Sequence, residues 1–184
     1  NLSGLMFPFL GQQLRGGQKI DIIGCEPLSC PSFTKGKYAY DHGDMAKMTP
    51  LIKMHTLGSD FLPPATHSGG LRYHGMSYHL SHLYDLGLMR AKAYGQKECF
   101  EAGINFGQQE GIIPAPEATH AVKGAIDAAL ECKEKGESKT ILFNLCGHAH
   151  FDMSAYDDYL SGNLAEDIFE EDSANKSMAN LPQV

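Results

Sequence analysis

Helix-like and strand-like segments alternate along this chain, and that alternation is the feature that most constrains its fold. Apolar residues at helical spacing predict helices over residues 2–14, 75–86, 96–109, 117–135 and 153–160. Short apolar or β-branched runs between them predict strands over residues 19–24, 88–94, 111–115 and 140–145. Strands that are separated by helices pair in parallel through crossover connections. We therefore predict an α/β fold, with a mainly parallel sheet between two helical layers in a three-layer α/β/α arrangement.

Two stretches depart from this alternation. Residues 26–70 are rich in Pro, Gly, Ser and Thr and show little periodicity, so we predict a long loop rather than sheet there. Residues 163–184 are acidic, and we expect them to form a frayed C-terminal tail. The segments up to residue 162 then form one folded unit.

Composition and charge exclude several classes of protein. The chain has 184 residues, of which 42% are hydrophobic and 20% charged, as in ordinary globular proteins. A formal net charge of −7, with Lys and Arg scattered, argues against a nucleic-acid surface. No apolar stretch approaches the roughly 20 residues of a membrane span, and no basic segment precedes an apolar one. We therefore expect a cytoplasmic protein.

The cysteines and the first residue carry two further expectations. The five cysteines are odd in number and form no CxxC pair, so neither a disulfide framework nor a zinc ribbon is indicated. The chain begins at Asn1 rather than at a methionine, where a loop should meet a helix. We interpret it as part of a longer polypeptide.

Ligands of open parallel sheets bind beyond the carboxyl ends of the strands, which selects four places in this sequence. They are the helix start at Asn1, the pair Glu110–Gly111, the run 146–150 and the turn 69–75. Helix N-termini bind phosphate, although an Asn there also serves as a simple N-cap. Glu110 either points into a pocket or is a solvated helix end. The turn either offers backbone carbonyls to a cation or is only a tight connection.

The histidines do not form a metal site. His148 and His150 lie two residues apart, but zinc requires three or four ligands and no partner cluster with suitable spacing occurs. His79 and His82 share one helix face, where solvated histidines are common. We predict no metal ligands among these side chains.

Four long motifs carry a resemblance to a known family. They are GCEPLSCPS at 24–32, GGLRYHGM at 69–76, EGIIPAPEATHA at 110–121 and LFNLCGHAHFDMSAYDDYLSG at 142–162. In this order they resemble the C-terminal part of the tryptophan synthase β-chain family, in particular its divergent second subtype. The resemblance implies that residues 1–162 are the cofactor-binding part of a fold-type II enzyme that depends on pyridoxal 5'-phosphate.

The resemblance also implies roles for individual residues. Asn1 matches the last residue of the family's glycine-rich phosphate loop, and Glu110 matches a glutamate beside the cofactor ring. Cys146 stands where the family usually has a serine that meets the pyridine nitrogen, and Gly147 follows it at the cofactor. A thiol is neutral like a hydroxyl, so it does not force protonation of that nitrogen. The family's Schiff-base lysine follows a histidine, and no Lys in this sequence does so.

A cation site is a further implication of the family. The carbonyls of Tyr73 and Gly75 match positions that help to hold a monovalent cation. Arg72 stands where the better-known subtype has an Asp, so the gating role of that Asp does not carry over.

For the whole enzyme the resemblance implies the joining of indole and L-serine to give L-tryptophan and water. It implies a homodimer, with a tryptophan synthase α-chain as a further partner. Within the same chemistry the alternatives are a serine or threonine dehydratase and a threonine synthase, against which the runs GIIPAPE and NLCGHAHFD argue. A non-catalytic interaction module is the alternative from another class, because the Schiff-base lysine is not in this chain.

Overall fold

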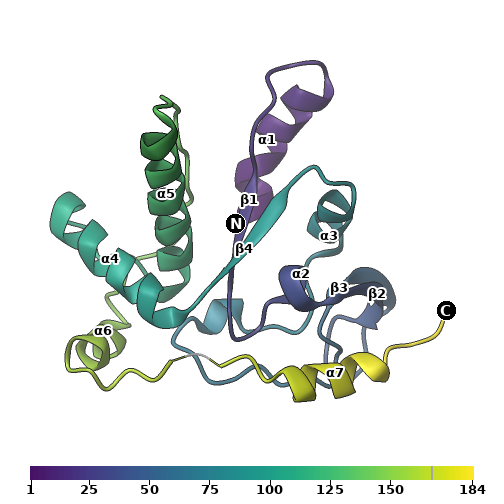
Figure 1. Ribbon diagram of the computed structural model, residues 1–184. Coiled ribbons are helices and arrows are strands. Elements are labelled where there is room, and N and C mark those ends of the chain that lie inside the picture. Colours follow the sequence, from purple (N-terminus) through teal and green to yellow (C-terminus); the bar gives the residue numbers. More distant parts are fainter. Residues whose placement is uncertain (167) are drawn as a thin grey trace.

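A short parallel strand pair lies at the centre of the structure, a computed structural model that describes residues 1–166 and 168–184 (Figure 1). Strand β1 (Ile23–Pro27) pairs with β4 (Arg90–Tyr94), from Ile23 opposite Arg90 to Pro27 opposite Tyr94. Two α-helices and an antiparallel strand pair lie between the two strands in the chain, so the connection is long enough for parallel pairing. The α/β class and the parallel pairing of these two strands are confirmed.

Helices account for most of the regular structure. The described residues contain α1 (Leu2–Leu14), α2 (Ser32–Lys35), the 3-10 turn η1 (Gly69–Leu71), α3 (Tyr78–Asp85), α4 (Gln96–Glu110), α5 (Pro116–Lys135), α6 (Met153–Leu160) and α7 (Glu171–Ala179). The five predicted helices are confirmed as α1, α3, α4, α5 and α6, with small shifts at their ends. Apolar spacing predicts them well because each buries one face locally.

Helices cover both faces of the β1–β4 pair. On one face α1 and α3 contribute to a core cluster of Met6, Leu10, Ile22, Phe33, Met76, Leu80 and Met89, against which Ala91 also packs. On the other face Lys92 and Tyr94 of β4 reach α5: the Lys92 Nζ donates to Glu131 at 2.8 Å and the Tyr94 hydroxyl to Asp127 at 3.0 Å. Alternate residues of β4 thus face opposite helical layers.

An antiparallel hairpin corrects the prediction of a loop over residues 26–70. Strand β2 (Lys37–His42) pairs with β3 (Leu51–Thr56), with Lys37 opposite Thr56 and His42 opposite Leu51. A hairpin needs only a local turn, so its strands can form within a stretch that is rich in Pro and Gly. Composition alone therefore did not predict strands β2 and β3.

The tail is also different from the prediction, because residues 171–179 form α7 rather than a frayed end. Its apolar face packs on the hairpin side of the molecule, in a cluster of Cys30, Leu57, Phe61, Ala174, Met178 and Leu181. Ala174 is fully buried. The acidic residues Glu171 and Asp172 lie in the first turn, where the helix dipole favours negative charge.

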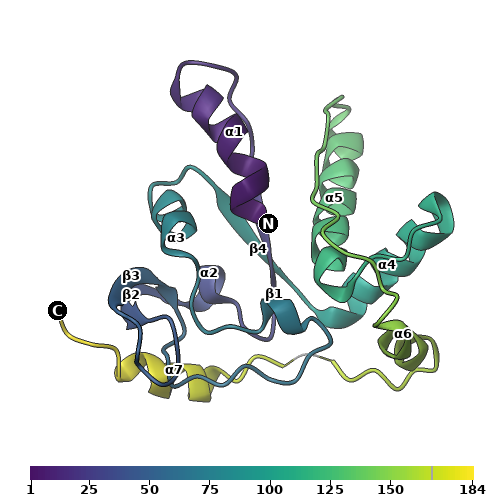
Figure 2. The ribbon, with the colours of Figure 1, turned by 180° about the vertical axis from the view of Figure 1, so that it is seen from behind.

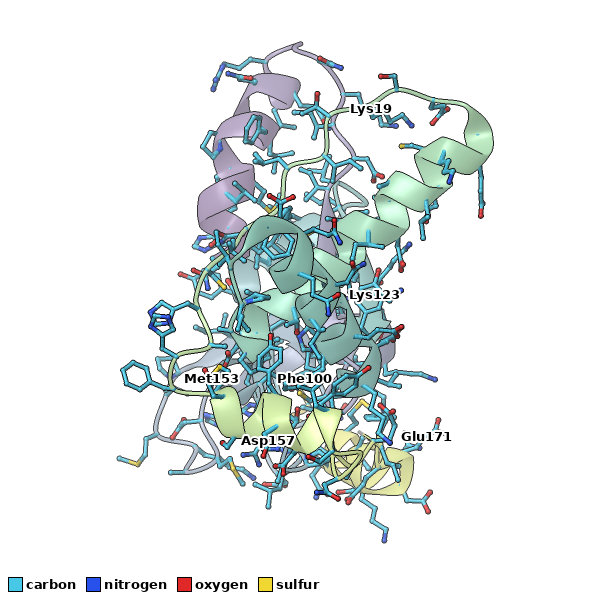
Figure 3. The ribbon with its side chains drawn as sticks, turned by 90° about the vertical axis from the view of Figure 1, so that its left-hand side faces the viewer. Lys19, Phe100, Lys123, Met153, Asp157 and Glu171 are labelled. Carbon is cyan, nitrogen blue, oxygen red and sulfur yellow. The ribbon has the colours of Figure 1, made fainter. Side chains whose placement is uncertain are left out.

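Helices α4 and α6 form a third core cluster. Helix α6 packs on α4 in a cluster of Phe100, Ala149, Ala155, Tyr156 and Leu164. Figure 3 shows α6, with Met153 and Asp157, beside Phe100 of α4.

The strands predicted over 19–24, 111–115 and 140–145 need correction. The first begins later, at Ile23, because its partner β4 begins only at Arg90. In the part of the chain that the structure describes, residues 111–115 form a single antiparallel bridge, between Pro114 and His148, and no strand. Residues 140–145 form no strand among the described residues and run along α5 on the side that faces α1 (Figure 2). Without a neighbouring strand the run stays partly exposed, with Leu142 at 60%.

Candidate functional site

Asn1 stands at the N-cap of α1. Its carbonyl accepts the N–H of Leu5 at 3.1 Å, but its side chain makes no capping hydrogen bond. Asn1 therefore caps the helix through its backbone carbonyl and not through its side-chain amide. The amide side chain and the first N–H groups of the helix are available to an anion.

The stretches that carry Glu110 and Cys146 lie against each other. The N–H of Ala115 donates to the Gly147 carbonyl at 2.9 Å, and the N–H of Ala149 donates to the Ile113 carbonyl at 3.0 Å. The hydroxyl of Tyr156 donates to the Pro114 carbonyl at 2.6 Å and secures the same stretch from α6. Two of the predicted site segments, distant in sequence, thus share one short bridge.

Both side chains at this bridge are open to solvent. Glu110 is the exposed last residue of α4, which ends where Gly111 adopts φ +71°, a conformation that favours glycine. Cys146 is exposed as well, so its thiol is not part of the packed core. Among residues 1–166 and 168–184 no hydrogen bond joins Asn1 to either of them.

The turn 69–75 lies on the hairpin. Gly75 forms an antiparallel bridge with Thr56, and the Arg72 guanidinium donates to the Pro63 carbonyl at 2.9 Å. Burial raises the pKa of the Tyr73 hydroxyl to about 12. The turn is therefore an ordered part of the hairpin unit.

Sequence comparison decides the family. The chain is 56% identical over 164 residues to "Tryptophan synthase beta chain 2" of Methanosarcina mazei, which covers 89% of this chain and 37% of the relative. It is 55% identical over 169 residues to the protein of the same name from Aquifex aeolicus, covering 90% and 39%. The chain is a homologue of the tryptophan synthase β chain. The predicted resemblance is confirmed.

The match to the tryptophan synthase β chain extends over nearly the whole sequence but not over the whole relative. The "Tryptophan synthase beta chain" of Pyrococcus horikoshii is 48% identical over 182 residues, which are 99% of this chain and 39% of the relative. The chain thus spans about two fifths of the length of these relatives. No protein-family model matches it.

Two further features of this tryptophan synthase β homologue are a pair of histidines in the run 146–150 and an apolar groove elsewhere. His148 and His150 are exposed neighbours with ring centroids 4.1 Å apart, and the described residues contain no group of three or more potential metal ligands. An apolar groove between α1, α3 and the hairpin contains none of the predicted site residues. Among the described helices none is long and apolar enough to cross a membrane.

Sequence reasoning missed two buried carboxylates. Glu26 accepts the N–H groups of Phe33 and Thr34, both at 2.9 Å, and so holds the start of α2. Burial raises the pKa of Glu26 although these hydrogen bonds act in the opposite direction. Asp41 is fully buried beneath the turn 69–75. Both lie in stretches that composition marked as loop, and no sequence signal separated them from exposed acids.

Proposed function

We propose that this chain is part of a pyridoxal-phosphate-dependent tryptophan synthase β chain, which joins indole and L-serine to give L-tryptophan and water. The single observation that carries the proposal is the 56% identity with a protein of that name over 89% of the chain. The bridge between 113–115 and 147–149 supports it, because it gathers the segments of Glu110 and Cys146.

The residues of this chain suit part of a cofactor site. The uncapped amide of Asn1 and the N-terminus of α1 suit the phosphate group. Cys146 offers an uncharged thiol to the pyridine nitrogen, and Gly147 beside it packs closely against Ala115, where an added Cβ would stand 3.0 Å from the Ala115 Cβ. When bound, the cofactor supplies an electron sink for bonds at the amino-acid substrate.

Glu110 supplies the negative charge of the site. Its exposed carboxylate stands at the end of α4, within five residues of the bridge to Gly147. We assign it the role of balancing charge that changes on the cofactor and substrate during replacement. Because Cys146 is neutral, the site does not favour a protonated ring nitrogen, which suits replacement at Cβ.

The wider architecture belongs to the same proposal. Helices on both faces of β1 and β4 are consistent with a three-layer, mainly parallel sheet of a fold-type II enzyme. In the whole protein the exposed run at 140–145 joins that sheet as a strand, with residues 1–162 as its cofactor-binding part. We further propose a cytoplasmic homodimer, a tryptophan synthase α-chain as partner and a monovalent cation at the turn 69–75.

The proposal is tested in the longest natural polypeptide that contains this chain. With cofactor, L-serine and indole we expect L-tryptophan, and Glu110→Gln should lower kcat about 100-fold. Glu101→Gln, the same substitution at an exposed position of the same helix, should leave kcat unchanged. A keto acid formed from L-serine without tryptophan would indicate a dehydratase. No turnover and no cofactor absorbance would favour the non-catalytic module.

A further inference from the structure

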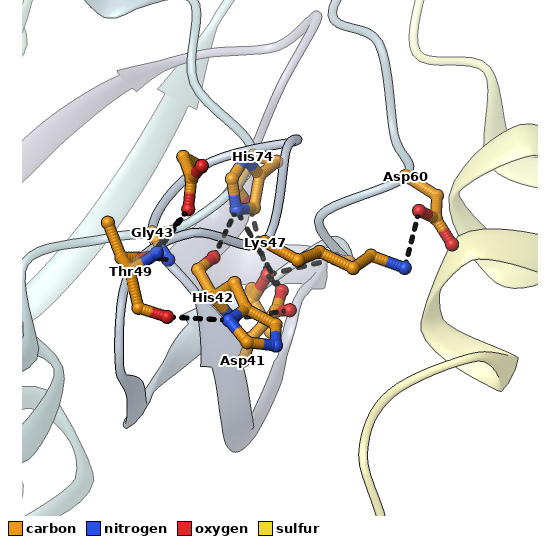
Figure 4. A network of polar contacts seen from close by, with 10 residues as sticks. Asp41, His42, Gly43, Lys47, Thr49, Asp60 and His74 are labelled. Atoms are coloured by element: carbon orange, nitrogen blue, oxygen red, sulfur yellow. Dashed lines mark hydrogen bonds and ion pairs between the residues drawn. The ribbon is translucent and has the colours of Figure 1, made fainter.

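A buried polar network joins the β2–β3 hairpin to the turn that precedes α3 (Figure 4). Asp41 is 0% exposed. Its Oδ2 accepts the Thr56 hydroxyl at 2.7 Å, and its Oδ1 accepts the N–H of His42 at 2.8 Å. The His74 Nε2 lies 2.8 Å from the His42 carbonyl and 3.9 Å from Asp41 Oδ2. Since a carbonyl only accepts, this nitrogen carries a hydrogen.

The backbone at His74 and at Met76 is hydrogen-bonded to the end of β3 and to Leu57, the residue that follows it. The N–H of Leu57 donates to the His74 carbonyl at 2.8 Å, and the N–H of Met76 donates to the His55 carbonyl at 2.9 Å. The peptide bond between Gly75 and Met76 is trans, so the Gly75 carbonyl points opposite to the Met76 N–H, away from β3. Among residues 1–166 and 168–184 no donor reaches the carbonyl oxygens of Tyr73 or Gly75.

Residue 75 also lies directly on the hairpin. A Cβ added there would stand 2.6 Å from the Met54 sulfur, so a larger residue at position 75 would force the Met54 side chain to shift. The direction of the Gly75 carbonyl therefore depends on how β3 is held.

We propose that Asp41, Thr56 and His74 are positioning residues that direct the Gly75 carbonyl toward a monovalent cation. The proposal rests on the proposed function, which places such a cation at this turn. A buried carboxylate with satisfied hydrogen bonds is rigid, and rigidity of the groups behind a ligand sets cation affinity. The outward Gly75 carbonyl fits a hard cation, which prefers oxygen ligands.

The hairpin offers a matched control at its other end. Thr49 is exposed, and its hydroxyl donates to Asp44 at 2.7 Å, just as Thr56 donates to Asp41. Thr49→Val and Thr56→Val therefore remove the same hydroxyl from the same hairpin, and only the second breaks the buried network.

The experiment measures thermal unfolding of the longest natural polypeptide that contains this chain. Midpoints are recorded against concentration of NaCl, KCl or CsCl, with tetramethylammonium chloride holding ionic strength constant. For Thr56→Val and His74→Ala we expect the cation concentration that gives half-maximal stabilisation to rise about tenfold or more. Thr49→Val should keep the original value, and His74→Gln, which retains a donor, should restore most of it.

Several outcomes would overturn the proposal. An equal fall of the midpoint in every salt, with the half-maximal concentration unchanged in Thr56→Val, would show a purely structural network. A rise of the half-maximal concentration in Thr49→Val as large as that in Thr56→Val would also contradict the proposal. Absence of cation-specific stabilisation in the unsubstituted protein would show that no monovalent cation binds at this turn. Tryptophan formation in the same preparation would still test the proposed function separately.

Discussion

Cys146 is the residue whose chemistry most directly tests the proposed site, because it is exposed beside Gly147 and is the group that we propose at the ring nitrogen. Cys146→Ser should change the rate of tryptophan formation by no more than about twofold, since both groups are neutral and similar in size. Cys146→Asp should lower it about tenfold or more, because a carboxylate favours a protonated ring nitrogen. Cofactor absorbance and product ratio with L-serine and indole measure both.

The comparison of the two variants decides the orientation of the residue. If Ser abolished turnover while Asp left the absorbance unchanged, Cys146 would not face the ring nitrogen.

Also at the scale of single residues, the buried carboxylates of Glu26 and Asp41 could not be predicted from the sequence. A buried acid and an exposed one look alike in sequence, and only the donors that surround the carboxylate distinguish them.

At the scale of elements, α7 tests whether tertiary packing orders a segment that its acidic composition predicts to be frayed. Met178 is 7% exposed and belongs to the cluster that includes Leu57 and Phe61. Met178→Ala should lower the free energy of unfolding by about 2–5 kcal/mol, because it leaves a cavity between α7 and the hairpin unit. Asn175→Ala, on the exposed side of α7, should change it by less than about 0.5 kcal/mol. Urea denaturation measures the free energy of unfolding of both variants. Equally small effects of the two substitutions would indicate that the C-terminal residues are frayed, as their composition predicts.

At the scale of the whole molecule, the position of the Schiff-base lysine tests the proposed match to the family. No Lys of this sequence follows a His. In the longest natural polypeptide that contains this chain, borohydride trapping with the cofactor should label one lysine outside residues 1–184. Peptide mapping locates the adduct. A stoichiometric adduct on a single lysine within this chain would show that the match to the family's site is misplaced.

The sequence by itself determined the helices and the family. Helices α1, α4, α5 and α6 follow from apolar spacing, since a helix satisfies its own backbone hydrogen bonds and needs only one buried face. The motif GGLRYHGM and its companions predicted homology to the tryptophan synthase β chain, which the identity of 56% confirms.

Only the tertiary structure decided the strands and the polar contacts. A strand exists where a partner is available, so residues 37–42 and 51–56 pair in spite of their composition, whereas the apolar run 140–145 stays unpaired. The same holds for Asp41, Thr56 and His74, which are distant in sequence and meet beneath one turn. Local patterns carry no information about such partners, because strand pairing and buried hydrogen bonds join residues that the chain itself keeps apart.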